Sequence, residues 1–224
     1  REAQSGLIGR IGSTGSGTGA AVVARINREE SLMLARNVKA LSGFIQNVPD
    51  ILRGCLDKKE RIIIEGTQGF GLSPLHSRHY PYTTSRDTTA AAFLSETGLS
   101  PFDIDDIILT IRTFPIRVSG NSGPLLNEIS WKTISNESGQ FKEICEETSV
   151  SNKIRRVARF SPDVVALAIR ANMPNRIVLN HIDYVHISER NNVLRDIENL
   201  IGRRIDLAGL SQSILVNVDQ VSKI

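Results

Sequence analysis

The sequence predicts an α/β fold, with a mostly parallel central sheet flanked by helices. Short apolar runs typical of buried strands occur at residues 61–65, 106–113, 176–180 and 213–216. Segments with helical periodicity separate them, and this alternation is typical of parallel sheets. The 224 residues, 40% of them hydrophobic, suffice for one ordinary core, so we expect a single domain over residues 1–224.

The composition excludes several classes of protein. The two cysteines, Cys55 and Cys145, form no CxxC or metal-spaced pattern, so we expect reduced thiols in a cytoplasmic protein without a zinc framework. No apolar run approaches the roughly 20 residues that span a membrane. The net charge of +3 is too small to indicate a nucleic-acid-binding protein. The local basic cluster at residues 153–159 still needs an explanation.

Start and stop signals accompany the expected helices. Apolar residues recur at three- and four-residue steps over residues 31–56, where Pro49 is expected to interrupt the helix. Asp87 and Thr88 can cap a helix that ends at Gly98. The expected helices span residues 20–27, 31–56, 90–98, 161–172 and 189–201.

The first stretch that could carry chemistry is the glycine-rich motif Gly12-Ser-Thr-Gly-Ser-Gly17, which precedes a helix. Glycines let backbone amides approach an anion, and the positive end of a helix favours a phosphate there. The motif lacks the lysine of a P-loop. A tight turn is an equally good interpretation of its composition.

Two further stretches lie in a long polar segment after the first strand. Glu65-Gly-Thr-Gln-Gly-Phe-Gly-Leu72 leaves the carboxyl end of that strand, where open α/β sheets bind ligands, although a turn with Gln68 exposed explains it equally well. Tyr80-Pro-Tyr-Thr-Thr-Ser-Arg-Asp-Thr-Thr89 suits a phosphate, a ribose or an elaborate helix cap. His76 and His79 resemble a weak metal pair without a third ligand, so we expect no metal site.

Two more stretches carry charge. Residues 149–159 place four cations in seven residues, which suits either a carboxylate or phosphate site or a solvated basic face. Asp183 follows the expected strand 176–180, and its carboxylate could accept both the ring N–H and the amino group of guanine. Asp is also a common turn residue after a strand.

In this order and spacing, the motifs resemble those of the adenylosuccinate synthetase family, ligases that join aspartate to inosine monophosphate (IMP) at the expense of GTP. The resemblance runs from about Arg10 to the C-terminus and extends through Pro115-Ile-Arg-Val118 and Arg155-Arg-Val157. It implies a P-loop-like ligase fold that lacks its N-terminal part, here the C-terminal two-thirds of the protein. It also implies a homodimer that uses small-molecule substrates, with no nucleic-acid or membrane partner.

The resemblance implies contacts to the phosphate of the substrate nucleotide. Ser13 and Thr14 match the hydroxyls that hold the 5′-phosphate, and Thr84 matches a third phosphate contact.

Other nucleotide contacts follow from the same resemblance. Arg28 matches the arginine that crosses the dimer interface to the neighbouring site. Gln68 matches a catalytic glutamine near O6 and N1 of the purine. Leu72 matches a residue that lies along the base, and Val118 matches a ribose contact.

The charged stretches acquire roles as well. Val150, Ser151, Lys153 and Arg155 match the mobile loop that closes on the aspartate carboxylates, which explains the basic cluster. The remaining matches concern GTP: Asp183 matches the residue that reads guanine, and Asn217 and Asp219 lie where the family completes the guanine pocket.

The family reaction has two steps, which require Mg²⁺ and GTP. An aspartate deprotonates N1 while the γ-phosphate moves to O6, and the amino group of the substrate aspartate then displaces phosphate at C6. The catalytic Asp of the WGDEGKGK loop and the catalytic His of the NAGH stretch have no counterparts in these 224 residues. We therefore expect a preceding segment to supply them, together with most of the Mg²⁺ ligands.

Departures from the family pattern leave alternatives open. Ser151-Asn-Lys153 replaces Thr-Gly-Arg, and Asn180-His-Ile-Asp183 replaces Thr-Lys-Leu-Asp. These changes resemble the short archaeal and phage branches, and phage members use dGMP and ATP. Asp183 instead favours GTP. A third possibility is a non-catalytic nucleotide-binding or scaffold protein, for which an intact mass near 24.6 kDa is expected.

Overall fold

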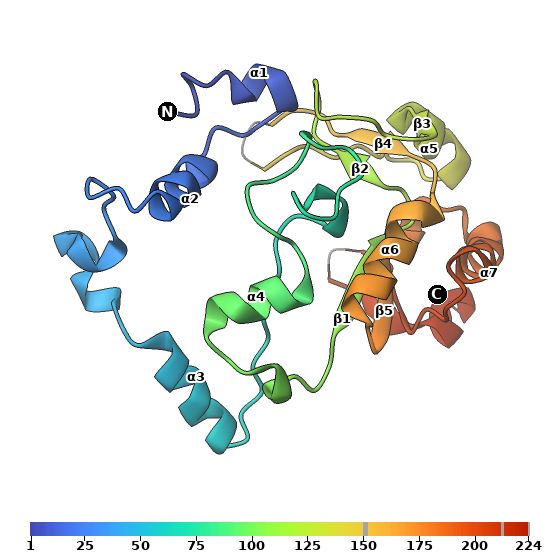
Figure 1. The fold of residues 1–224 in the computed structure, drawn as a ribbon. Helices are drawn as coiled ribbons and strands as arrows, with labels where there is room; N and C mark the ends of the chain where they lie inside the picture. The colour runs from blue at the N-terminus through green and yellow to red at the C-terminus, as the bar shows by residue number, and fades with distance from the viewer. Residues whose placement is uncertain (150–151, 212, 224) are drawn as a thin grey trace. The chain divides into compact units, whose positions relative to one another are not determined.

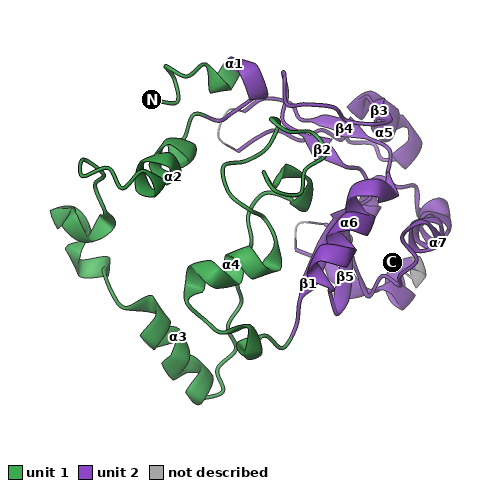
Figure 2. Ribbon diagram, viewed as in Figure 1, with its two compact units in different colours: residues 1–8, 15–105 green, residues 9–14, 106–224 purple. Residues whose placement is uncertain are grey.

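The computed structural model describes residues 1–149, 152–211 and 213–223, without the side chains of residues 222 and 223. The chain divides into two compact units (Figure 2). Unit 1 comprises residues 1–8 and 15–105, and unit 2 comprises residues 9–14 and 106–224. The single domain expected over the whole chain stays a prediction. No helix in the described part of the chain is long and apolar enough to cross a membrane.

Unit 2 contains the predicted mostly parallel sheet, flanked by helices (Figure 1). Its strand order is β1-β5-β6-β7, in which β1, β5 and β6 run parallel and β7 is antiparallel. Three strands confirm predicted ones, whereas β6 was not predicted, because its sequence Leu-Ala-Gly forms no apolar run typical of a strand. The strands are β1 (Ile108–Arg112), β5 (Arg176–Asn180), β6 (Leu207–Gly209) and β7 (Leu215–Asn217).

Unit 2 also contains a small antiparallel sheet, the helices α5, α6 and α7, and the 3-10 helices Ile182–Tyr184, Ile187–Glu189 and Val218–Lys223. The small sheet has the order β2-β4-β3, and α6 contacts both β1 and α7. Pro162 opens α6, as predicted, because the first helical turn needs no backbone N–H from that residue. The bounds are β2 (Ile116–Arg117), β3 (Glu128–Ile129), α5 (Trp131–Ser138), β4 (Arg156–Ala158), α6 (Pro162–Asn172) and α7 (Arg190–Ile201).

The hydrophobic core lies within unit 2, where the alternating strands and helix faces bury their apolar side chains. Ile134, Ile177, Leu179 and Ile182 are fully buried. Burial of each such side chain contributes about 1.5–3 kcal/mol. The core cluster extends from Ile111 to Val221, and none of its described members belongs to unit 1.

Unit 1 consists of helices and loops. α3 begins with Pro49 in its first turn, so this proline starts the helix and does not interrupt it as expected. Only the last part of the predicted helix over residues 31–56 is α-helical, and two 3-10 helices precede it. The bounds are α1 (Leu7–Ile11, which spans the boundary between units), α2 (Thr18–Ile26), α3 (Val48–Asp57), α4 (Ala90–Thr97) and the 3-10 helices Ala35–Asn37, Lys39–Phe44, Phe70–Leu72 and Pro101–Asp103.

The prediction of a buried strand at residues 61–65 is wrong. The segment forms no helix or strand and belongs to neither sheet, and Ile63 is 83% exposed. An apolar run forms a strand only where a neighbour pairs its backbone N–H and C=O groups, and no described strand does so here.

Candidate functional site

The first half of the glycine-rich motif lies in unit 2, against the loop that carries Val118. Gly12 has φ +71°, and a Cβ there would come 3.3 Å from Val118 Cγ2. The side-chain amide of Asn121 also donates to the carbonyl of Arg10 at 2.8 Å. The structure thus brings the segment of Ser13, a predicted phosphate contact, next to Val118, the predicted ribose contact.

The second half of the motif begins α2 in unit 1, and its amides already hold an anion. The backbone N–H groups of Gly17 and Ala20 donate to the Glu2 carboxylate at 2.8 and 3.2 Å. These hydrogen bonds, first that from Gly17, lower the pKa of Glu2. The helix end expected to receive phosphate is therefore occupied by a side chain of the protein, and Glu2 was not predicted from the sequence.

The polar segment 66–89 of unit 1 is folded around the buried side chain of Ser73. The backbone N–H of Thr84 donates to the carbonyl of Leu72 at 2.8 Å, which brings these two predicted nucleotide contacts together. Gln68 is exposed and has a left-handed backbone, with φ +68°. Such a conformation is uncommon for a residue with a side chain and is concentrated at functional sites.

Asp87 ties this segment to α4. Its carboxylate accepts hydrogen bonds from the Ser73 hydroxyl at 2.8 Å, the Thr88 N–H at 2.8 Å and the Thr89 hydroxyl at 2.6 Å. Burial alone would raise the pKa of Asp87, but these donors outweigh it and lower the pKa. Thr89, and not the expected Asp87 or Thr88, caps α4, while Gly98 ends it in the left-handed conformation as predicted.

The remaining predicted contact of unit 1 is exposed. Arg28 follows α2 with φ +55° and an exposed side chain.

His76 contacts an aromatic ring and lies near an acid. It stacks on Phe70 with ring centroids 5.4 Å apart, and its Nε2 lies 3.9 Å from Asp87 Oδ1. The described residues contain no group of three or more His, Cys, Asp or Glu side chains that could hold a metal ion.

The basic stretch of unit 2 forms a hairpin. Glu147 and Ile154 make an antiparallel bridge, and the Thr148 N–H donates to the carbonyl of Lys153 at 3.0 Å. Lys153 is exposed, and Arg155 Nε donates to the carbonyl of Glu147 at 3.2 Å. The predicted contacts Val150 and Ser151 lie outside the described residues.

Two arginines of this stretch have acidic partners. Arg156 pairs with Glu128 at 2.6 Å, and Arg159 pairs with Glu137 at 2.5 Å. Lys153 and Arg155, in contrast, make no ion pair with any described residue. The basic cluster therefore divides into two arginines that stabilise the fold and two cations whose charge is available to a ligand.

Asp183 lies just beyond the carboxyl end of β5, beside the carboxyl end of β1. Its Oδ1 is buried and has no hydrogen-bond partner among the described residues. Burial raises the pKa of this carboxyl group. An ionised carboxylate oxygen buried without a donor is costly, so the site is complementary to a ligand that brings N–H groups.

The turn after β6 reaches the same edge of the sheet. β5 and β6 are parallel, so their carboxyl ends lie side by side, and a Cβ on Gly209 would come 2.6 Å from Asn180 Oδ1. Gly209 permits this close approach of the two strand ends. Gly209 was not predicted from the sequence, because β6, the strand that it ends, was not predicted.

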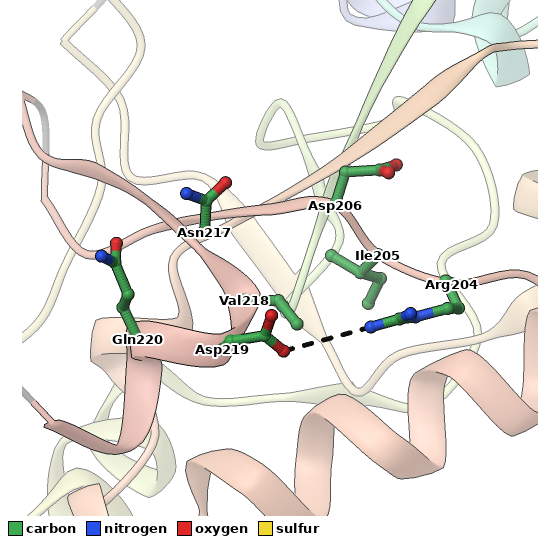
Figure 3. A pocket seen from close by; sticks show the side chains of 7 residues that line it. All are labelled: Arg204, Ile205, Asp206, Asn217, Val218, Asp219 and Gln220. Atoms are coloured by element: carbon green, nitrogen blue, oxygen red, sulfur yellow. Dashed lines mark ion pairs between the residues drawn. The ribbon is translucent and has the colours of Figure 1, made fainter.

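Asn217 and Asp219 line a different hollow, shown in Figure 3. Its volume is about 430 Å³, and Arg204 reaches across it to Asp219, 4.0 Å away. Leu207, at the start of β6, pairs with Asn217 at the end of β7, so this hollow lies at the opposite end of the strands from Asp183. The structure therefore does not bring Asn217 and Asp219 together with Asp183, as one guanine pocket requires. Its lining residues are Arg204, Ile205, Asp206, Asn217, Val218, Asp219 and Gln220.

Comparison with known proteins identifies the family. The family model described as adenylosuccinate synthetase matches residues 29–213, most of the chain. This chain belongs to the adenylosuccinate synthetase family. The adenylosuccinate synthetase of Methanocaldococcus jannaschii is 33% identical over 214 residues, which cover 93% of this chain and 59% of that protein.

A phage relative is about equally similar. The N6-succino-2-amino-2'-deoxyadenylate synthase of Vibrio phage phiVC8 is 34% identical over 206 residues, which cover 88% of this chain and 58% of that protein. This chain thus spans less than two thirds of the length of the archaeal and the phage relative.

Solved structures agree on the fold. The succinoaminodeoxyadenylate synthetase of cyanophage S-2L, bound to dGMP and to dATP as an energy donor, superposes with a TM-score of 0.80 at 27% identity. That match covers 99% of this chain and 67% of the phage protein. The fully ligated adenylosuccinate synthetase from Plasmodium falciparum, 14% identical with a TM-score of 0.64 over 86% of this chain and 59% of that one, shares the fold.

Proposed function

We propose that this chain carries nucleotide- and aspartate-binding parts of a purine nucleotide:aspartate ligase, which joins L-aspartate to IMP and converts GTP to GDP and phosphate. The proposal depends most on the buried Asp183 Oδ1, which lacks a donor among the described residues. The N1–H and N2–H groups of guanine together supply two donors to one carboxylate. Adenine offers no such adjacent pair.

Each unit is assigned its own set of proposed contacts. In unit 2, Ser13, Thr14 and Val118 contact the phosphate and ribose of the substrate nucleotide, and Lys153 and Arg155 neutralise the carboxylates of aspartate. A substrate dianion placed beside such cations is favoured electrostatically.

In unit 1, Gln68 is assigned to O6 of the purine, while Leu72 contacts the base and Thr84 the phosphate. Charge that develops on O6 during phosphoryl transfer would be stabilised by the donor amide of Gln68. Mg²⁺ accompanies the triphosphate in this reaction, and no described residue is assigned to it.

The experiment that tests the proposal is an assay of the complete enzyme with IMP, aspartate, Mg²⁺ and GTP. We expect aspartate-dependent phosphate release together with adenylosuccinate. Absence of both products would refute the proposal. Lys153→Ala should raise the KM for aspartate at least tenfold while the KM for IMP changes little, and Lys142→Ala, an exposed lysine outside the hairpin, serves as the matched control.

A second candidate has its own support. It is ligation of aspartate to dGMP with ATP, favoured by the phage synthase at 34% identity and by the 27% identical structure bound to dGMP and dATP. Turnover on IMP and dGMP, each with GTP and with ATP, separates the two candidates. A preference for dGMP would replace the first proposal with the second.

The proposed assembly is a homodimer in which Arg28 reaches the neighbouring site. Its exposed position after α2 is compatible with this role. Arg28→Ala should weaken binding of the substrate nucleotide about tenfold without loss of the dimer, since an arginine–phosphate contact is a charge-assisted hydrogen bond. Sedimentation with a nucleotide titration checks both parts, and unchanged affinity in a verified dimer would discard the role.

A further inference from the structure

The side chain of Glu146 joins the end of β1 to the 3-10 helix Ile182–Tyr184 that follows β5. Its Oε1 accepts a short hydrogen bond from Arg112 at the end of β1, and another from the Tyr184 hydroxyl at 3.1 Å. The side chains of Arg112 and Glu146 are only 25% and 19% exposed. Limited contact with water strengthens such an ion pair compared with one on the surface.

Tyr184 is held firmly by its surroundings. Its ring centroid lies 4.7 Å from that of His181 and 6.3 Å from that of Trp131, which it meets edge-on. Burial and the adjacent Glu146 raise the pKa of Tyr184, so its hydroxyl remains a hydrogen-bond donor at neutral pH. Because Tyr184 directly follows Asp183, the same short turn carries the proposed base-reading carboxylate and the partner of Glu146.

Glu146 also stands at the base of the basic hairpin. Its backbone carbonyl accepts the N–H of Arg155 at 2.8 Å, and the carbonyl of Arg155 accepts the indole N–H of Trp131 at 2.7 Å. A shift of the Asp183 turn therefore reaches the hairpin through one hydroxyl–carboxylate contact and one backbone hydrogen bond.

We propose that Glu146 and Tyr184 are positioning residues that couple binding of the triphosphate's base at Asp183 to binding of aspartate at the hairpin. This inference rests on the proposed function. A base that donates to Asp183 fixes the turn, and the fixed Tyr184 hydroxyl holds Glu146 and the first strand of the hairpin. Aspartate then binds Lys153 and Arg155 on backbone that is already held at Glu146, which gives positive cooperativity between the two ligands.

The chain contains its own reporter, since Trp131 is its single tryptophan and contacts both the hairpin base and Tyr184. The experiment follows Trp131 fluorescence while L-aspartate is titrated, first alone and then with saturating GTP and Mg²⁺. Calorimetric titrations provide an independent measure of both affinities. We expect GTP to tighten aspartate binding about tenfold in the unaltered protein, within the usual range of such coupling.

Tyr184→Phe removes only the hydroxyl. We expect the GTP effect on aspartate affinity to fall to less than threefold, while the affinity for each ligand alone changes less than threefold. Glu146→Gln replaces the charged acceptor of Arg112 and of the Tyr184 hydroxyl by a neutral amide oxygen, so it should lower the GTP effect as well. The double variant should lower the effect little further, because both changes act on the Glu146–Tyr184 contact. Glu143→Gln removes the same charge from an exposed side chain three residues away and should leave the coupling unchanged.

The other outcomes separate the two hypotheses. If the unaltered protein binds neither aspartate nor GTP, the proposed function itself fails. If it binds both without coupling, or if Tyr184→Phe keeps the tenfold effect, the inference is overturned and the proposed function stands. Equal weakening of both ligands with the coupling intact would show a merely structural role and would also overturn the inference.

Discussion

Each of the two units is stabilised internally by a different kind of interaction. Unit 2 surrounds its parallel sheet with a continuous apolar core, whereas the only described apolar side chains buried in unit 1 are Ala24 and Leu94. Unit 1 instead buries polar groups, including Ser73 and Thr88, around the Asp87 carboxylate. The difference teaches that burial of apolar area stabilises unit 2, while unit 1 depends on a few directional hydrogen bonds.

The largest expected effect is on the units produced separately. A fragment of residues 106–224 should unfold cooperatively, because it retains the whole core cluster. A fragment of residues 15–105 should show no cooperative transition, since it buries too little apolar area to offset chain entropy. Circular dichroism during urea titration checks both fragments. A cooperative transition in the second would contradict the comparison.

Truncation of an apolar side chain should have the next largest effect, and it should lower the unfolding free energy in unit 2 far more than in unit 1. Leu179→Ala removes a fully buried side chain of β5 and should lower the free energy of unfolding by about 3 kcal/mol. Ile63→Ala, at a position 83% exposed in unit 1, should change it by less than about 0.5 kcal/mol. Urea denaturation of both variants measures the difference, and equal losses would show that unit 1 has an apolar core after all.

The polar cluster of unit 1 should depend on the charge of Asp87. Asp87→Asn should destabilise the 66–89 segment by about 2 kcal/mol, because charge-assisted hydrogen bonds are lost. The folded-state pKa of Asp87 is lowered, so its stabilisation is present above the unfolded pKa of about 3.9 and is lost as the pH falls through the folded pKa. Amide hydrogen exchange between pH 7 and pH 3 measures this, with the exposed Asp105→Asn as control.

An Asp-to-Asn substitution at Asp183 in unit 2 should change stability in the opposite direction. The folded-state pKa of Asp183 is raised by burial, so stability present below its unfolded pKa of about 3.9 is lost as the pH rises through the folded pKa. Asp183→Asn should therefore raise the unfolding free energy at pH 7 by about 0.5–1 kcal/mol, and it should abolish the preference for a guanine base. Thermal unfolding and competition between GTP and ATP test both parts. A destabilised variant would show that Asp183 supports the fold.

Sequence patterns predicted the elements that carry their own signals. Strands β1, β5 and β7 and helices α2, α4, α6 and α7 were expected, because each combines an apolar run or period with a start or stop residue. The strand at 61–65 failed because an apolar run alone does not specify a pairing neighbour. Strands β4 and β6 were missed because Arg-Val-Ala and Leu-Ala-Gly form no apolar run, whereas the equally short β7 follows from the run Ile-Leu-Val at residues 214–216.

The sequence could provide candidate site residues but not the contacts that support them. The resemblance to the family motifs selected Gln68, Lys153 and Asp183, whose residue types suit ligand contacts and whose roles stay predictions. It could not identify Glu2 or Glu146, because a single acid in a polar segment carries no local signal. Their importance follows from contacts formed over distances along the chain of 15 and 38 residues, to Gly17 and Tyr184 respectively.

The carboxylate of Glu2 at the start of α2 has a consequence for ligand binding. Because Glu2 holds the amides of Gly17 and Ala20, the turn before α2 keeps its shape without a bound phosphate. Fixing the backbone of one residue costs about 1–2 kcal/mol, and here the protein meets that cost during folding. A nucleotide that binds beside this turn meets a preorganised surface, so less of its binding energy is spent on ordering the loop.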